Sequence, residues 1–238
     1  MGLRDRGREQ TRPVSVEAGF SQHAASVIFR MGQTVVHCSA MSEEKAPLFV
    51  PEGTGWVTAE YAMLPSSSQQ RVQRARNGKI DGRSQEIQRL IGRSVRAVVD
   101  TKALGPRSIS LDCDVLNADG GTRCASICGS YVALVLAVRA LEKRGVLDSR
   151  KVLVDEVAAV SVGIVDGQAV LDLAYEQDVR AEVDMNLVMT GRGQMVEVQG
   201  TGERSTFSME QLQQMIKLGQ AGIEQILDVM RAYIRSVS

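Results

Sequence analysis

Aromatic side chains and metal-binding side chains are scarce in this chain of 238 residues. Phe, Trp and Tyr make up 4% of the sequence, and the two histidines are His23 and His37. No two of the four cysteines form a Cys-x-x-Cys pair. A zinc site therefore lacks ligands. We expect the cysteines to be buried free thiols in a reducing compartment; they are Cys38, Cys113, Cys124 and Cys128.

Long apolar runs and leader-like features are also missing. The first residues, MGLRDRGREQTRP, are charged and do not have the pattern of a signal peptide. No apolar run approaches the roughly 20 residues that a membrane span requires. We therefore expect a cytoplasmic protein with no membrane partner.

A net charge of one sign is absent, because 28 Lys and Arg residues balance 28 Asp and Glu residues. The charges are unevenly distributed, however. Residues 71–107 contain ten basic and three acidic side chains, whereas residues 155–203 contain ten acidic and two basic ones. This pattern is expected if one protein binds both a polyanion and a metal ion. Two solvated faces of opposite charge would give the same pattern.

Apolar side chains at helical spacing predict two helices in the first two thirds of the chain. The first spans about Ser84–Asp100, with Ser84 as the N-cap and Glu86 in the first turn. The second spans about Arg123–Arg144 and is apolar almost all round, which indicates deep burial. Gly145 follows it, where a left-handed residue commonly ends a helix.

A third helix is predicted to begin at Ser208, whose spacing to Gln211 fits a capping box. Alternating and short apolar runs predict strands elsewhere. The pattern as a whole predicts a single α/β (α+β) domain over residues 1–238, with helices packed on mixed sheets. A linker at Glu142–Lys151 would separate an N-terminal half, about 12–142, from a C-terminal half, about 152–235. The predicted strands are Val27–Phe29, Thr34–Ala40, Trp56–Met63, Ile109–Val115, Val152–Val154, Val157–Val165, Ala169–Ala174, Val183–Met189 and Met195–Gln199.

The motif ADGGTR, at residues 118–123, lies between a predicted strand and the second helix. Its two glycines leave the backbone open, and N–H groups at a helix N-terminus favour an anion. Thr122 adds a hydroxyl group and Arg123 a planar guanidinium that suits phosphate. Taken alone, an ordinary glycine turn before a helix explains the motif at least as well. Arg83, at the start of the first helix, offers a second arginine, and the two features together favour a shared oxyanion pocket.

Three carboxylates, Asp178, Glu182 and Asp184, follow a predicted strand. On an extended strand Asp178 and Asp184 would lie roughly 20 Å apart, too far to share an ion. They can cooperate only if the chain turns near Gln177–Glu182, where the apolar alternation stops. One or two carboxylates suffice for Mg²⁺, which keeps several waters. A charged hairpin tip is the alternative interpretation.

Residues 66–79, SSSQQRVQRARNGK, are polar and rich in arginine, which predicts a mobile loop. Arginines spaced along such a segment suit contact with a phosphate backbone. A solvated, charged loop is an equally good interpretation of the same residues.

Several segments resemble the ribonuclease PH family, in order and over nearly the whole chain. The longest are EIQRLIGRSVRAVVD at residues 86–100 and LDCDVLNADGGTRCASI at residues 111–127. Shorter ones are GWVTAEYAMLP at 55–65, AAVSVGIVDG at 158–167, DMNLVMTGRG at 184–193 and VEVQGTGE at 196–203. Several ordered matches are far more specific than one isolated motif.

The resemblance implies the ribonuclease PH fold and a phosphate-dependent 3′→5′ exoribonuclease. Such an enzyme trims RNA 3′ ends, notably those of tRNA precursors, and takes part in tRNA and rRNA processing. It releases nucleoside 5′-diphosphates, and in reverse it acts as a nucleotidyltransferase. The family assembles a homo-hexamer, a trimer of dimers. The alternative is a catalytically silent RNA-binding ring or scaffold subunit of an exosome-like assembly.

The resemblance also implies roles for individual residues. One departure from the family is Ser66, which stands where the family's loop typically begins with arginine. The implied phosphate-binding residues are Arg83, Gly121, Thr122 and Arg123. Asp178 and Asp184 are implied to be catalytic and to hold Mg²⁺, and Arg71, Arg74 and Arg76 to contact RNA.

Overall fold

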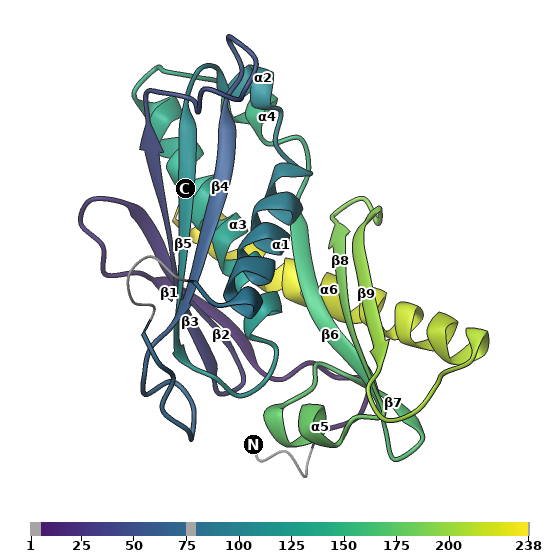
Figure 1. Ribbon diagram of the computed structural model, residues 1–238. Helices are drawn as coiled ribbons and strands as arrows, with labels where there is room; N and C mark the ends of the chain where they lie inside the picture. Colours follow the sequence, from purple (N-terminus) through teal and green to yellow (C-terminus); the bar gives the residue numbers. More distant parts are fainter. Residues whose placement is uncertain (1–5, 75–79, 238) are drawn as a thin grey trace.

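The computed structural model describes residues 6–74 and 80–237, which form two β-sheets and the helices packed on them (Figure 1). The N-terminal half contributes one sheet and the C-terminal half the other. A long helix, α3 (Thr122–Lys143), packs against strands of both sheets. The structure confirms the predicted α/β class.

The N-terminal sheet has five strands in the order β1-β2-β3-β5-β4. Its pairs are antiparallel except β4 and β5, which run parallel. Parallel neighbours require a crossover, and here the crossover carries helices α1 (Gly82–Arg96) and α2 (Thr101–Leu104). The strands are β1 (Val14–Ala18), β2 (Ala25–Met31), β3 (Thr34–Glu43), β4 (Trp56–Met63) and β5 (Ser108–Asn117).

The C-terminal sheet has four antiparallel strands in the order β7-β6-β8-β9. Every residue of β6 is buried, because α3 and α6 (Met209–Ser236) both pack against it. Ser208 caps α6 in the predicted capping box with Gln211. The strands are β6 (Val157–Val165), β7 (Gln168–Leu171), β8 (Val183–Thr190) and β9 (Met195–Gly202), and α5 (Tyr175–Arg180) lies between β7 and β8.

Helix α3 is buried almost all round, as its sequence predicts, and its exposed residues lie in the last turn. On one side, a Cβ atom on Gly129 would lie 2.5 Å from the Sγ atom of Cys38 in β3. On the other side, the N–H group of Ala159 in β6 donates to the Sγ atom of Cys128 at 3.3 Å. One hydrophobic core therefore runs through both halves of the chain. All four cysteines are buried free thiols, as predicted.

The sequence predicts no stretch that is long and apolar enough to cross a membrane. This prediction is wrong for α3, which by length and composition alone could span one. An 18-residue window of this helix has a mean hydropathy of 1.8. Within the protein, however, 83% of that window is buried. The core helix of a folded domain has this character because both of its sides face other elements of the chain.

The boundaries predicted for the first helix are wrong. Asp81 is the N-cap of α1, and its carboxylate accepts a hydrogen bond from the N–H group of Ser84 at 2.9 Å. The helix ends at Arg96, and Asp100 caps α2 instead of ending α1. Glu86 consequently lies beyond the first turn. In each case an aspartate that accepts backbone N–H groups starts a helix.

The strand predicted at Val152–Val154 is also wrong. Residues Ser149–Val152 form a short helix, α4, with Asp148 as its N-cap. The carboxylate of Asp148 accepts from the N–H group of Arg150 at 3.1 Å, which starts the turn. Of the predicted strand, one isolated bridge between Leu153 and Val99 is present.

Candidate active site

A cavity of about 770 Å³ lies where the two halves of the chain meet. Residues from both halves line it, including the turn before α3, the start of α1, helix α5 and strand β8. The structure brings all six predicted phosphate-site and acidic residues to this one cavity. They are Arg83, Gly121, Thr122, Arg123, Asp178 and Asp184.

The turn before α3 needs its two glycines. Gly120 and Gly121 have φ angles of 76° and 66°, in the left-handed region that favours glycine. A Cβ atom on Gly120 would lie 2.5 Å from the carbonyl oxygen of Leu173. Gly121 is the N-cap of α3 and supplies no side-chain cap. The first N–H groups of the helix therefore remain available to an anion.

Thr122 and Arg123 are held by residues of other elements. The hydroxyl groups of Thr122 and Tyr61 lie 2.9 Å apart, which fixes the first residue of α3 against β4. The Nη1 atom of Arg123 donates to the Oε1 atom of Gln199 at 2.9 Å and lies 3.6 Å from the carboxylate of Glu86. Both side chains are therefore oriented before any ligand binds.

Arg83 is exposed at the second position of α1. Its positive charge acts on Tyr61 and Asp178, and so does the charge of Arg123. Burial raises the pKa of Tyr61, and both guanidinium charges oppose that shift. The two arginines thus give the cavity a positive side, built from the N-terminal ends of α1 and α3.

Asp178 and Asp184 meet because α5 turns the chain before β8 begins. Burial raises the pKa of Asp178, against the charges of Arg83 and Arg123. Burial, and then the negative charge of Asp178, raises the pKa of Asp184 to about 6. Two carboxylates that repel each other in a cavity are suited to a cation between them. The predicted turn is therefore present, as a short helix.

Glu182 does not belong to this acidic pair. Its Oε1 atom accepts a hydrogen bond from the N–H group of Gly167 at 2.9 Å, and it is not part of the cavity lining. The carboxylate supports the hairpin between β6 and β7 instead.

The arginine-rich segment begins at the cavity wall. Ser68, Gln69, Gln70 and Val72 line the cavity, and the buried Ser67 accepts a hydrogen bond from the N–H group of Ala118 at 2.7 Å. Arg71 and Arg74 are exposed and do not line the cavity. Arg76, the third predicted RNA contact, lies outside the described residues, as does Lys79 at the end of the segment.

The cavity contains polar residues that the sequence analysis did not single out. Asp119 lies inside the ADGGTR motif, so its position could have been recognised. The others come from separate elements, and no local pattern joins them to the motif. They include Ser161, Tyr175, Asn186, Glu203 and Arg204.

Comparison with known proteins gives a consistent result along the whole chain. Residues 10–140 match domain 1 of the 3′ exoribonuclease family, and residues 155–222 match domain 2. The chain is 51% identical over 233 residues to ribonuclease PH of Syntrophomonas wolfei, covering 97% of each chain. It is 50% identical over 238 residues to ribonuclease PH of Rhodopirellula baltica, covering 98% of this chain and 97% of the relative.

Solved structures share the fold at low sequence identity. Rice Rrp46 superposes with a TM-score of 0.80 at 17% identity, covering 98% of this chain and all of that one. A chain of the Archaeoglobus fulgidus exosome with RNA bound to the active site gives a TM-score of 0.77 at 17% identity. That match covers 95% of this chain and 91% of the other.

Proposed function

The chain belongs to the ribonuclease PH family of 3′ exoribonucleases, and on that premise we propose that it shortens RNA by phosphorolysis. Inorganic phosphate is the attacking group, and each cycle removes the 3′ nucleotide as a nucleoside 5′-diphosphate. The substrates are RNAs with 3′ tails, notably tRNA precursors. In reverse, the same site adds nucleotides from nucleoside diphosphates to an RNA 3′ end.

One observation carries the proposal: a single cavity has a positive side from one half of the chain and an acidic pair from the other. Arg83 and Arg123 lie with the glycine turn on the N-terminal side, and Asp178 and Asp184 on the C-terminal side. Phosphoryl transfer depends on positioning and on electrostatic stabilisation of spread negative charge. A site with both signs of charge can hold the anion and neutralise the reacting phosphates.

The phosphate co-substrate is held by the arginines, the Thr122 hydroxyl and the N–H groups around Gly121. A phosphate oxygen forms a bond to the phosphorus atom of the last phosphodiester, in line with the leaving oxygen. The bond from that phosphorus to the 3′ oxygen of the preceding nucleotide breaks. The 3′ oxygen takes up a proton and becomes the new RNA end. Arg83 and Arg123 stabilise the charge that develops on the equatorial oxygens.

The acidic pair fits Mg²⁺, because hard cations prefer carboxylate oxygens and Mg²⁺ keeps several waters. In the described part of the chain, no three or more His, Cys, Asp or Glu side chains form a metal-binding group. Asp178 and Asp184 would hold the ion together with waters and substrate phosphates. When bound, Mg²⁺ would neutralise charge on the reacting phosphoryl group.

The proposed assembly is a homo-hexameric ring, a trimer of dimers, with RNA as its macromolecular partner. Support comes from the family and from fold relatives in exosome structures. Arg71, Arg74 and Arg76 would contact the RNA backbone at the ring's interior. Four free thiols suit a reducing compartment, which supports a cytoplasmic location. Light scattering on the purified protein would give the number of subunits.

The central experiment uses a tRNA with a short 3′ tail, Mg²⁺, and the purified protein with and without inorganic phosphate. We expect shortening only with phosphate, and nucleoside 5′-diphosphates as the products. Nucleoside monophosphates released without phosphate would identify a hydrolytic nuclease. RNA binding with no shortening in either condition would identify a silent ring or scaffold subunit.

A further inference from the structure

We propose that Arg12 is a positioning residue that holds the Asp119–Gly121 turn in shape for phosphate by tying it to Asp172. The inference rests on the proposed function and deepens it. Arg12 precedes β1 and Asp172 follows β7, so the two residues come from opposite halves of the chain. Neither of them lines the cavity.

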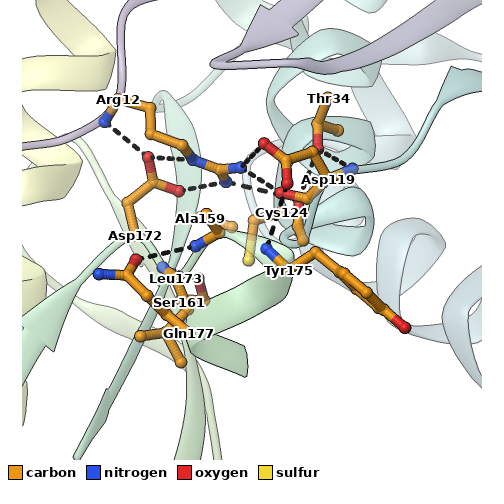
Figure 2. A network of polar contacts seen from close by, with 12 residues as sticks. Arg12, Thr34, Asp119, Cys124, Ala159, Ser161, Asp172, Leu173, Tyr175 and Gln177 are labelled. Carbon is orange, nitrogen blue, oxygen red and sulfur yellow. Dashed lines mark hydrogen bonds and ion pairs between the residues drawn. The ribbon is translucent and has the colours of Figure 1, made fainter. Parts of the chain in front are cut away.

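The ion pair between Arg12 and Asp172 is buried and multiply bonded (Figure 2). The exposed fractions of the two residues are 4% and 0%. The Nε atom of Arg12 donates to the Oδ2 atom of Asp172 at 2.9 Å, and the Nη2 atom donates to Oδ1 at 2.6 Å. The backbone N–H group of Arg12 also donates to Oδ2, at 2.7 Å. The guanidinium therefore has one fixed orientation.

The same guanidinium reaches the phosphate turn. Its Nη1 atom donates to the carbonyl oxygen of Asp119, and its Nη2 atom to that of Gly120 at 3.4 Å. Thr34, fully buried in β3, donates its hydroxyl to the Gly120 carbonyl at 2.6 Å and accepts from the Asp119 N–H group at 2.9 Å. Arg12 and Thr34 together hold both carbonyl oxygens of the turn.

Holding those carbonyls determines where the adjacent N–H groups point. In a trans peptide the C=O and N–H bonds lie in one plane and point in opposite directions. The N–H groups of Gly120 and Gly121 therefore point away from Arg12 and Thr34. Within the described part of the chain, neither of these two N–H groups has a protein acceptor. Both glycines line the cavity, so we infer that these donors serve the phosphate.

The anchor for Arg12 is itself rigid. Asp172 has a φ angle of 53°, which is unusual for a residue with a side chain. Its N–H group donates to the carbonyl of Ser161 in β6 at 2.7 Å, and the N–H group of Leu173 donates to the Ser161 hydroxyl at 3.0 Å. The chain thus fixes Asp172 to the central strand of the C-terminal sheet. Through Arg12, the phosphate turn is tied to the half that carries the acidic pair.

Arg6 offers a matched control. It donates to the carbonyl oxygen of Asp172 at 3.1 Å and to the Oε1 atom of Gln177 at 3.0 Å. It makes no hydrogen bond to the Asp119–Gly121 turn. Arg6→Lys keeps the positive charge near Asp172 and Asp119 and removes no hydrogen bond from the Asp119–Gly121 turn.

The test measures nucleoside diphosphate release by Arg12→Lys and Thr34→Val with phosphate and RNA varied separately. Arg12→Lys keeps the charge opposite Asp172 but loses the planar fork. We expect the KM for phosphate to rise roughly tenfold, as for the loss of one charge-assisted hydrogen bond. The KM for RNA should stay within about twofold, because Arg71 and Arg74, two of the proposed RNA contacts, do not line the cavity. Thr34→Val should shift the phosphate KM in the same direction, and Arg6→Lys should leave both constants unchanged.

A purely structural role would lower the active fraction and leave the phosphate KM of the remaining enzyme unchanged. That result, or an equal effect from Arg6→Lys, overturns the inference. If Arg12→Lys does not fold, Thr34→Val decides the question, because it leaves the buried ion pair intact. Failure of the wild-type protein to require phosphate would instead refute the proposed function. A wild-type requirement for phosphate, with normal phosphate KM values in both variants, would refute only the role of Arg12.

Discussion

Arg83 and Arg123 line the same cavity but are held differently. Arg123 is oriented by Gln199 and Glu86, whereas Arg83 is an exposed residue at the start of α1. Exposed charged side chains contribute little to stability. Replacing Arg83 should therefore change catalysis with less effect on stability than replacing Arg123 would.

Arg83→Ala should reduce phosphorolysis by a factor on the order of 10²–10³, as for the loss of one preorganised donor to a reacting group. RNA binding should remain largely intact. The measurement is the initial rate of diphosphate release at limiting phosphate, beside RNA affinity from fluorescence anisotropy. Arg89→Ala, on the same helix and also exposed, is the control and should be near wild type. Near-normal turnover by Arg83→Ala would remove Arg83 from the phosphate site.

Asp184→Asn should reduce phosphorolysis and the reverse addition reaction together, by a factor on the order of 10²–10³. The amide keeps the size and shape of the side chain but removes the charge that would hold Mg²⁺. One site serves both directions, so the two rates are measured on the same preparation. Glu182→Gln is the control, because Glu182 bonds to Gly167 outside the cavity. Equal damage from the two variants would mean that the metal site is misplaced.

The raised pKa of Asp184 predicts a pH-dependent effect on stability in metal-free protein. The pKa is about 6 in the folded chain against an ordinary value of 3.8. The contribution of Asp184 to the free energy of unfolding is thus fully present below pH 4. It falls by up to about 3 kcal/mol as the pH rises through 6. Asp184→Asn carries no charge, so its gain over wild type in urea unfolding with EDTA should be larger at pH 8 than at pH 5. A gain of equal size at the two pH values would contradict the assignment.

At the scale of elements, the segment after β4 begins beside the cavity and carries the arginines that are predicted to contact RNA. Ser67 is bonded to Ala118, so the segment starts beside the phosphate turn. Ser66 is exposed at that point, where the family's loop typically carries arginine. A positive charge added there lies close to the expected path of the RNA 3′ end.

Ser66→Arg should tighten RNA binding and steepen the dependence of log affinity on log salt by up to about one phosphate contact. The measurement is fluorescence anisotropy with a tailed RNA over a series of KCl concentrations. Ser236→Arg adds the same charge at the exposed end of α6 and should not change the slope. An unchanged slope for Ser66→Arg would place this residue off the RNA path.

The elements that could be predicted are those that local pattern specifies. β4 and β6 match their predicted bounds residue for residue, because each is a continuous apolar or alternating run between turn residues. The elements that were missed, β1, α2, α4 and α5, span only four to six residues, which is too short for an apolar period to stand out. The glycine turn could be recognised locally. Its support from Arg12 could not, because Arg12 and Asp172 are 160 residues apart.

At the scale of the whole molecule, α3 makes the two halves interdependent. Its residues Cys124, Cys128 and Tyr131 face the C-terminal half, with hydrogen bonds to Asn186, Ala159 and Asp155. Its opposite side packs on β2, β3 and β5. Exposing several large buried side chains costs about 1.5–3 kcal/mol each. Net stabilities of domains are only about 5–15 kcal/mol.

Residues 1–142 alone should therefore not fold, although they contain the complete five-stranded sheet. We expect the full chain to unfold in one cooperative transition and the fragment to show none. The measurement is near-ultraviolet circular dichroism during heating, with the tyrosines and the tryptophan as probes. A cooperative transition in the fragment would show that the N-terminal half is an independent domain.

Because α3 is buried on both sides in the folded chain, one of its sides remains uncovered while the ribosome synthesises the C-terminal half. The chain emerges from its N-terminus, so α3 is complete before β6 and β8 exist to cover it. Synthesis from Lys143 to Thr190 takes on the order of 2 to 10 s at roughly 5–20 residues per second. During that interval the nascent chain displays a helix with the hydropathy of a membrane span. The helix that joins the two halves of the finished enzyme is thus an apolar segment that stays uncovered until the C-terminal half has been synthesised.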